Sequence, residues 1–474
     1  MNSVNTTALD MWSSRLVGMY IQRNKCKSLN VSADKIFYEK DLPDPYRLLK
    51  PDSIVTLDYR YDRLNVNTDY DYKVKFVNYG KLMAETKNVQ VWDQKVQQFH
   101  GGQEWKFVNN FIDDFSVPTN ALGTPKDALK AATDAVAECG HYPPANQEPA
   151  KSRLASFLWP NSDPQSDCSN NLDPASDYYG KNNLILGNGA SELIDLVMRL
   201  AKLTSPETCN YFKPGPVAAQ YKEYERAAKN CGLQVIAPSS ANDNLKANVV
   251  ALVNPCNPTG DFLSKDQVLD YIFNSADTTG DTFAIVDESM LPWHGPDFRA
   301  CSLATDLAAL ADISRTKRIH IFVIHSWTKL WCCTGLRLGS VVGCTRDHTS
   351  SLLKYQVPWS VNSSALAFLA TVVNNSEYLA ETWASTPKWR RMQVDALKSR
   401  FPQWTFHGEP FLSWIWIDTH DASVADTACQ VARSHGVPIR SGKPGYMMPT
   451  FIRIAVRSPD TFKFLFNAFD KNLD

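Results

Sequence analysis

The sequence lacks any long run of apolar residues, and nowhere do about 18 of them follow one another. A membrane-spanning helix is therefore not expected. Net charge is also nearly absent, because 49 Lys and Arg balance 50 Asp and Glu. Without a basic surface field, the chain is not expected to bind nucleic acid or an anionic membrane.

Paired cysteine motifs are missing as well. The 474 residues include 11 cysteines with no repeated C-x-x-C pair, and Cys332 and Cys333 are adjacent. This pattern predicts a reduced, cytoplasmic protein, and no metal site is predicted. The first thirty residues have no apolar core of a secretory signal. They are poor in acids and contain Arg15, Arg23 and Lys25, which is also compatible with an organelle transit peptide.

Residues 1–112 differ from the rest of the chain and show no catalytic constellation. The stretch from Asp58 to Gly80 mixes Tyr, Val and Asp in rough alternation, which predicts short strands or a hairpin. We treat this region as an N-terminal extension of unknown role.

Apolar strands and amphipathic helices alternate from about residue 113 onward. This order predicts an α/β domain over 113–355, with a mostly parallel, mixed sheet between layers of helices. Residues 356–474 are first helical and then return to strands, which predicts a smaller α+β domain. The expected strands of the larger domain are 184–186, 249–253, 283–286, 319–324 and 338–342, and its expected helices are 128–139, 190 onward and 263–275.

The stretch SWTKLWCCTGLRLG begins at Ser326, directly after an expected buried strand. Its lysine, Lys329, lies between Trp327 and Trp331. Removing an amine from water lowers its pKa and makes it a nucleophile toward carbonyl groups. A lone lysine of this kind is more often a surface residue, so its neighbours decide the interpretation.

Two nearby patterns are suited to binding a dianion. Ser326 and Arg337 flank the lysine at fixed offsets, with glycine turns around them. Separately, Ala190 and Ser191 follow a glycine turn that opens a helix, so free backbone N–H groups and the helix dipole point at one place.

Two further residues follow strand ends. Asp287 ends the strand 283–286 and is either a helix cap or a group that holds a proton on a heteroaromatic nitrogen. Asn257 lies in NPCNPTG, and its amide can donate to a phenolate oxygen. An amine, a phosphate site, a carboxylate and an amide donor are together the groups that pyridoxal 5′-phosphate requires.

From about Phe111 onward the chain resembles the class I/II aminotransferases, which are fold-type I enzymes dependent on pyridoxal phosphate. Within that family it is most similar to the branch of histidinol-phosphate aminotransferase and threonine-phosphate decarboxylase. The resemblance rests on five motifs in the family's order: GASE from Gly189, NPCNPTG from Asn254, Asp287-Glu288, SWTK from Ser326 and GLRLG from Gly335.

The resemblance implies a role for each matching residue. Lys329 would form the internal aldimine and move protons, Asp287 would pair with the pyridinium, and Asn257 would contact O3′. The phosphate would be held by Ala190, Ser191, Ser326 and Arg337.

Five other positions carry roles by the same resemblance. Tyr221 would stack on the cofactor ring, and Arg453 would bind the substrate carboxylate. Asn120 and Leu122 fall in the substrate segment. Tyr142 would reach the phosphate of a neighbouring subunit, which implies a homodimer.

The sequence departs from the family at two positions. Met290 stands where a tyrosine often contacts O3′, and this slightly favours the decarboxylases. Ala219 stands where a proline usually precedes the stacking aromatic residue. The leading expectation is an aminotransferase acting on an L-amino acid. A decarboxylase of a small, perhaps phosphorylated, amino acid and a non-catalytic homologue are the alternatives.

Overall fold

The computed structural model describes residues 6–23, 31–50, 63–79, 101–102, 104–108, 110–160, 180–205, 209–217, 219–237 and 244–473. Residues 58–62 and 80 of the expected hairpin stretch, and Lys25 of the N-terminal segment, lie outside the described residues. The chain divides into two compact units, residues 1–94 and residues 95–474.

The first unit is a small α+β structure with its own core. Trp12, Leu16, Ile21, Leu64 and Val66 are among its buried apolar residues. Strands β4 and β5 form an antiparallel pair, which confirms the expected hairpin. The elements of this unit are α1 (Thr6–Leu16), β1 (Tyr20–Gln22), β2 (Ile36–Tyr38), β3 (Tyr46–Leu49), β4 (Leu64–Thr68) and β5 (Val74–Tyr79).

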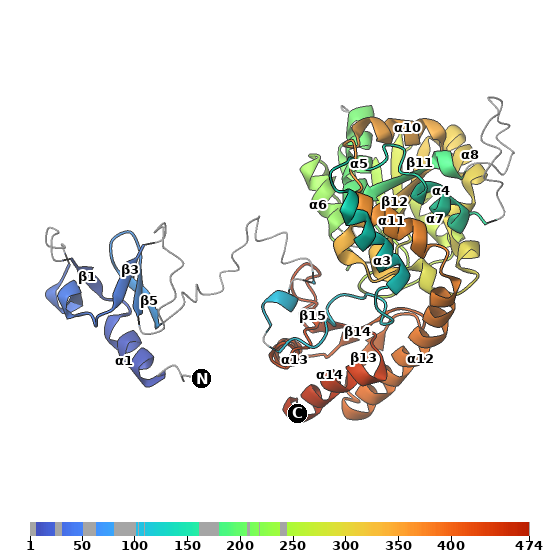
Figure 1. Ribbon diagram of the computed structural model, residues 1–474. Coiled ribbons are helices and arrows are strands. Elements are labelled where there is room, and N and C mark those ends of the chain that lie inside the picture. Colours follow the sequence, from blue (N-terminus) through green and yellow to red (C-terminus); the bar gives the residue numbers. More distant parts are fainter. Residues whose placement is uncertain are drawn as a thin grey trace. The chain divides into compact units, whose positions relative to one another are not determined.

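The second unit contains a seven-stranded sheet (Figure 1), in the order β6-β12-β11-β10-β9-β7-β8. Neighbouring strands are parallel except at β12, which is antiparallel to β11 and to β6. The expected mixed sheet is therefore confirmed. Its strands are β6 (Leu184–Asn188), β7 (Tyr211–Pro214), β8 (Gln234–Val235), β9 (Val249–Val253), β10 (Thr282–Asp287), β11 (Ile319–Ser326) and β12 (Leu338–Gly343).

The reversed direction of β12 follows from its short connection. Only residues 327–337 separate it from β11. A parallel neighbour would need a crossover of about a dozen or more residues, usually with a full helix. The segment that carries Lys329 therefore turns the chain back within the sheet.

Alternating side chains divide the apolar interior into two clusters, one on each face of the sheet. In β10, Ala284 and Val286 join the cluster that contains α4, α7, α8 and α11, whereas Phe283 and Ile285 join the cluster with α5 and α6. The helices are α3 (Lys126–Asp134), α4 (Ala150–Leu158), α5 (Gly189–Thr204), α6 (Glu223–Asn230), α7 (Lys265–Ser275), α8 (Leu307–Lys317), α10 (Arg346–Tyr355) and α11 (Ser363–Val372).

Helix boundaries differ slightly from the sequence expectations. The helix expected over 128–139 ends at Asp134 and continues as a 3-10 turn over Ala135–Glu138. Helix α7 begins at Lys265, because Ser264 and Gln267 form a reciprocal capping box that fixes its first turn.

The C-terminal part combines an antiparallel sheet with helices. Its antiparallel sheet has the order β13-β14-β16-β15. The elements are α12 (Ser376–Arg400), β13 (Thr405–His407), β14 (Trp414–Asp418), α13 (Ala422–Ser434), β15 (Arg440–Ser441), β16 (Phe451–Ala455) and α14 (Pro459–Asn472). Of the helices described, none is both long and apolar enough to cross a membrane.

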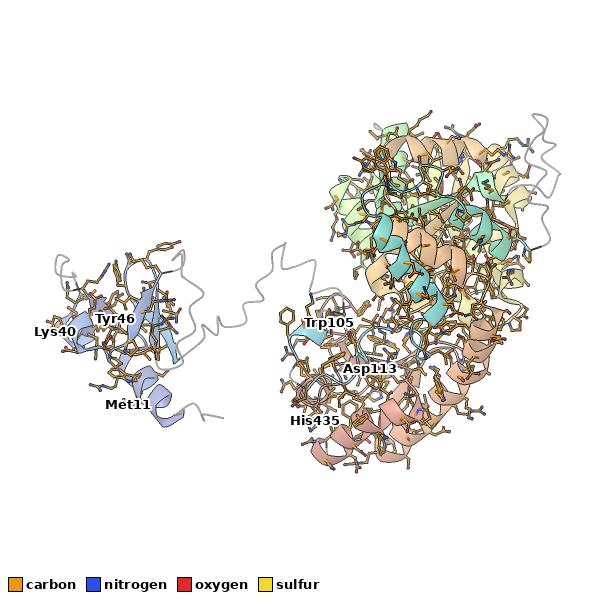
Figure 2. The ribbon with its side chains drawn as sticks, in the orientation of Figure 1. Met11, Lys40, Tyr46, Trp105, Asp113 and His435 are labelled. Carbon is orange, nitrogen blue, oxygen red and sulfur yellow. The ribbon has the colours of Figure 1, made fainter. Side chains whose placement is uncertain are left out.

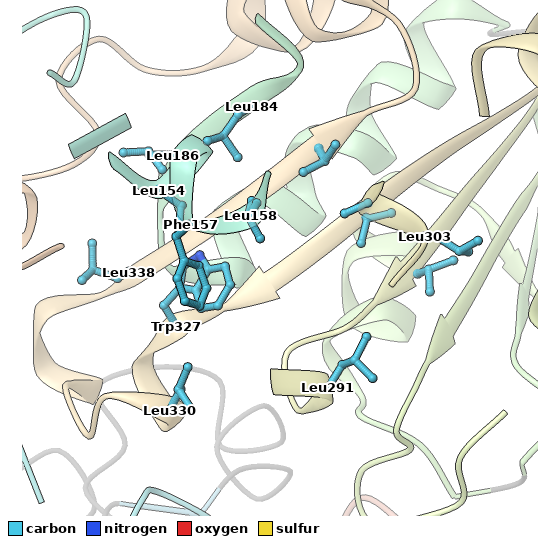
Figure 3. Packing of buried hydrophobic residues seen from close by; sticks show 14 of the residues in the cluster. Leu154, Phe157, Leu158, Leu184, Leu186, Leu291, Leu303, Trp327, Leu330 and Leu338 are labelled. Atoms are coloured by element: carbon cyan, nitrogen blue, oxygen red, sulfur yellow. The ribbon is translucent and has the colours of Figure 1, made fainter. Parts of the chain in front are cut away.

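Aromatic packing fixes the end of β11 (Figure 3). Trp327 is 1% exposed, and its ring meets the ring of Phe157 edge-on at 5.8 Å and stacks on Trp331 at 5.1 Å. Its indole N–H donates to Ser340 Oγ at 2.9 Å, which links the turn to β12. Trp327, directly before Thr328 and Lys329, is therefore held in one orientation.

Arg457 attaches the segment 113–119 to the small domain. It pairs with Asp113 at 2.8 Å and donates to four backbone carbonyls, three of them in this segment. The Arg457 side chain is 5% exposed. Its partner Asp113 is labelled in Figure 2. Segment 113–119 leads directly to Asn120, so this arginine helps position the residues around Lys329.

Arg457→Met is predicted to lower the free energy of unfolding by about 3 kcal/mol, because several buried carbonyls lose a donor and Asp113 loses its ion pair. Urea unfolding of the full chain measures this value. Arg400→Met is the matched control, since Arg400 pairs with Asp470 at the surface and its loss should cost at most about 1 kcal/mol. Equal losses in the two variants would contradict the anchoring role of Arg457.

Candidate active site

Lys329 lies in a single helical turn, α9 (Trp327–Leu330), at the carboxyl end of β11. Trp327, Thr328 and Leu330 are buried, so the lysine is the residue of this turn that faces away from the core. Its Nζ donates to Ser326 Oγ at 2.9 Å, and Ser326 Oγ lies 2.9 Å from Thr328 Oγ1. The turn therefore presents one amine and two hydroxyl groups together.

The environment of Lys329 favours the neutral amine. Burial is the main cause that lowers its pKa to about 8, and the positive charges of Arg337 and Arg453 act in the same direction. The negative charge of Asp287 opposes them. With that pKa, about a tenth of the amine is unprotonated at pH 7 and able to attack a carbonyl carbon.

Asp287 ends β10, the strand next to β11, and is 4% exposed. Its Oδ2 accepts a hydrogen bond from the Tyr224 hydroxyl at 2.9 Å, and its Oδ1 accepts one from the Ser289 N–H at 2.9 Å. Two donors hold the carboxylate in one orientation, which is what a partner for a protonated ring nitrogen requires.

An anion cradle forms where β6 leads into α5. Gly189 has φ +76°, and a Cβ there would lie 2.4 Å from Arg337 Nη2. A Cβ on Gly339 would lie 2.5 Å from the Ala190 nitrogen. No side chain caps the start of α5, so the N–H groups of Ala190 and Ser191 remain at the open end of the helix. The two glycines thus make room for Arg337 beside the helix N-terminus.

Arg453 reaches the site from β16 of the small domain and is 5% exposed. Its Nη1 donates to Asn257 Oδ1 at 2.5 Å, and its Nη2 donates to the Ser116 carbonyl at 2.6 Å. Its Nε is buried and has no partner among the described residues. Because Asn257 accepts through Oδ1, its Nδ2 remains as a donor toward the site.

Asn120 supports the lysine turn from behind. Its backbone N–H donates to the Lys329 carbonyl at 3.0 Å, and its Nδ2 donates to the Leu330 carbonyl and to Thr382 Oγ1. Its Oδ1 accepts from the Leu122 N–H at 3.1 Å. Asn120 is buried and uses both of its amide hydrogens on protein atoms, so its visible contribution is to position Lys329.

Tyr221 and Tyr142 occupy different surroundings. Tyr221 is partly buried, its ring meets that of Tyr224 edge-on at 6.4 Å, and burial followed by the charge of Glu223 raises its pKa. Tyr142 is 76% exposed and stacks on Trp359 at 4.2 Å. Tyr221 therefore belongs to the group around Asp287, whereas Tyr142 faces outward.

Three contacts of this site were missed by the sequence analysis. They are the Tyr224 hydroxyl on Asp287, the Ser289 hydroxyl, which accepts from the Ser326 N–H at 2.6 Å, and the Ser116 carbonyl on Arg453. Tyr224 follows Tyr221 by three positions, and this spacing is the one signal in the sequence that could have found it. Met290 is 5% exposed and packs in the core, so it takes no part in the polar group.

Residues 113–469 match the protein family described as aminotransferase class I and II. The chain belongs to this family. It is 27% identical over 352 residues to histidinol-phosphate aminotransferase 2 of Pseudomonas aeruginosa, which covers 72% of the chain and 84% of that protein.

Solved structures of the family share the fold. The histidinol-phosphate aminotransferase of Sinorhizobium meliloti, solved with pyridoxal 5′-phosphate, has a TM-score of 0.59 and 17% identity, over 75% of this chain and 89% of that one. L-Threonine-O-3-phosphate decarboxylase of Porphyromonas gingivalis has a TM-score of 0.57 and 17% identity, over 76% and 99%. The expected α/β fold is confirmed.

The residues of the site fit pyridoxal 5′-phosphate, the cofactor of this family. The donor set offers an amine at Lys329, a fixed carboxylate at Asp287 and a dianion cradle at Arg337. The cradle is shaped by backbone that a Cβ at Gly189 or Gly339 would fill. An amide donor at Asn257 completes the set.

Gly339→Ala is predicted to weaken cofactor binding at least tenfold, because the added Cβ would push β12 away from the first turn of α5. Absorbance titration of cofactor-free protein with pyridoxal phosphate measures the dissociation constant. Gly335→Ala is the control, since a Cβ there meets nothing within 4 Å. Unchanged affinity in Gly339→Ala would contradict the assignment of the cradle.

Lys329→Met is predicted to stabilise the cofactor-free protein at pH 7. The pKa of Lys329 is about 8 when folded, below its ordinary 10.5, so folding disfavours the ammonium form whenever the pH is below 8. Removing this cost should raise the free energy of unfolding by about 3 kcal/mol at pH 7. The gain should shrink between pH 8 and 10.5 and vanish above.

Urea unfolding at a series of pH values from 7 to 11 tests this prediction. Lys354→Met is the control, because Lys354 on α10 is exposed and its loss should change little at any pH. A loss of stability in Lys329→Met at pH 7, or a gain that does not depend on pH, would show that the amine is not held in a desolvated site.

Proposed function

We propose that this chain is an aminotransferase that acts on an L-amino acid. The observation that carries the proposal is the buried guanidinium of Arg453, which lies beside Asn257 and keeps an unpartnered Nε. A carboxylate is the group that a planar guanidinium binds with two parallel hydrogen bonds. A free α-carboxylate next to an amine is the common feature of amino acid substrates.

In this proposal Lys329 has two roles at one atom. Its Nζ would hold the cofactor aldehyde, and the same nitrogen would accept the proton from the substrate Cα and return it. Bound pyridoxal phosphate supplies an electron sink that stabilises the negative charge developing at that carbon. Asp287 would keep the ring nitrogen protonated, and Tyr224 and the Ser289 N–H keep Asp287 in place.

Arg440 suggests the class of side chain on the substrate. It lies directly opposite Arg453 in the β15–β16 pair and is 8% exposed. Burial lowers its pKa, and the charge of Arg453 contributes. Two buried cations side by side are stabilised by an anion near both. We infer a substrate with a second anionic group, such as a phosphate, in line with relatives named for phosphorylated substrates.

Decarboxylation of a small amino acid is the second candidate. The observation in its favour is Met290, which puts an apolar side chain in the core where many family members place a hydroxyl that contacts O3′. The reaction depends on which bond at Cα lies perpendicular to the cofactor ring, and Arg453 would set that angle by fixing the carboxylate.

We also propose that the enzyme works as a cytoplasmic homodimer. The exposed stack of Tyr142 on Trp359 supports the dimer, because two adjoining aromatic residues at the surface are typical of an interface. The nine cysteines among the described residues are all unpaired, which supports a reducing compartment.

One assay on the purified holoenzyme separates these readings. A panel of amino acids and phosphorylated amino compounds is incubated with an oxo-acid acceptor, and oxo-acid formation and carbon dioxide release are both measured. Amino transfer without carbon dioxide supports the proposal, and stoichiometric carbon dioxide supports the second candidate. Turnover of neither kind across the panel would overturn both.

Arg453→Lys is predicted to lower kcat/KM for the best substrate by about 10- to 100-fold, because a point-charge amine cannot replace the bidentate contact. Steady-state kinetics measure the change, and the cofactor absorbance should be retained. Arg433→Lys is the control, since Arg433 on α13 pairs with Glu104 at the surface. A normal kcat/KM in Arg453→Lys would remove Arg453 from the substrate site.

A further inference from the structure

A second group of reactive side chains lies at the other end of the sheet. His320 is the second residue of β11, Cys344 directly follows β12, and His348 is on α10. Ser326 lies six positions after His320 along β11, which corresponds to about 20 Å of extended strand. The group is therefore remote from Lys329 and plays no part in the site described above.

The three side chains converge closely. One possible ligand atom of each lies within 4.8 Å of the other two. Cys344 Sγ is 3.6 Å from His348 Nδ1, and the two imidazole rings are 4.2 Å apart. In a tetrahedral zinc site with bonds of about 2.0–2.3 Å, ligand atoms lie about 3.3–3.8 Å apart. To bind one ion, the ligand atoms would move about 1 Å closer together, which rotation of the three side chains can provide.

One of the histidines is already oriented as metal ligands usually are. His320 Nε2 lies 3.1 Å from Asp281 Oδ1, and Asp281 is held by two contacts of 3.0 Å from Arg318. Its other nitrogen, Nδ1, points to Ser314 Oγ at 2.8 Å. A carboxylate on one nitrogen of an imidazole is the common outer shell of zinc sites, and an ion at Nδ1 would replace the contact of that nitrogen with Ser314.

We propose that His320, Cys344 and His348 bind a zinc ion, with the fourth position open to water. Cysteine and histidine together favour zinc over magnesium or calcium, which prefer oxygen ligands. His320 and Cys344 are buried and His348 is partly exposed, so the ion would enter from the α10 side. The bound ion would connect β11, the end of β12 and α10.

Binding of the ion would replace a contact and release a proton. His348 Nδ1 lies 2.6 Å from Thr345 Oγ1, a contact that the ion would replace. The Cys344 thiol would release its proton to the solvent when the ion binds. No motif in the sequence revealed the group, because His320 lies 24 residues before Cys344 and comes from a different strand.

The test uses tag-free holoenzyme that has been treated with a chelator and dialysed. Zinc is titrated in competition with a chromophoric chelator, and cadmium is added separately to record the thiolate-to-metal absorption. The unmodified chain is expected to bind one equivalent of zinc and to show the cadmium–thiolate band. Zinc should also raise the thermal unfolding temperature.

Cys344→Ala and His348→Ala are each expected to weaken zinc binding at least 100-fold, and Cys344→Ala should lose the cadmium band. Cys209→Ala is the matched control, because Cys209 is also buried but lies outside the group. Retained cofactor absorbance in each variant shows that it is folded. The proposal is overturned if the unmodified chain binds no zinc at micromolar concentration, or if both variants bind it normally.

Discussion

A lysine amine held out of water at the carboxyl end of a buried strand is the constraint on which the rest of the site depends. Burying Lys329 is unfavourable for its charged form, and the surrounding structure keeps it there. Trp327 packs against Phe157 and Trp331 on the core side, and the Asn120 N–H binds the Lys329 carbonyl from below. These contacts fix the turn so that the Lys329 side chain points away from the core.

The site is complete only where the small domain meets the large one. Arg453 comes from β16, yet its two visible partners are Asn257, on the loop after β9, and Ser116, on the segment before Asn120. Arg457 on the same stretch anchors that segment through Asp113. Two arginines four residues apart therefore connect the surroundings of Lys329 to the packing of the domains, and a change in domain contact would move the Arg453 guanidinium relative to Lys329.

Much of this arrangement could be predicted because it depends on local patterns. Apolar runs marked β9, β10 and β11, and residues that follow such strands gather at one edge of the sheet, which located Lys329, Asp287 and Asn257. Contacts between distant segments gave no such signal. The donation from Tyr224 to Asp287 and the use of the Asn120 amide behind the lysine turn depend on tertiary packing. The antiparallel direction of β12 was not marked by a local pattern either, because it depends on the short connection from β11.

The central claim is that the amine of Lys329 carries pyridoxal phosphate covalently. Reduction of the purified holoenzyme with borohydride, followed by proteolysis and peptide mass spectrometry, tests it most directly. The account predicts a phosphopyridoxyl group on Lys329 and on no other lysine. An unlabelled peptide containing Lys329, or a label on a different lysine, would contradict it.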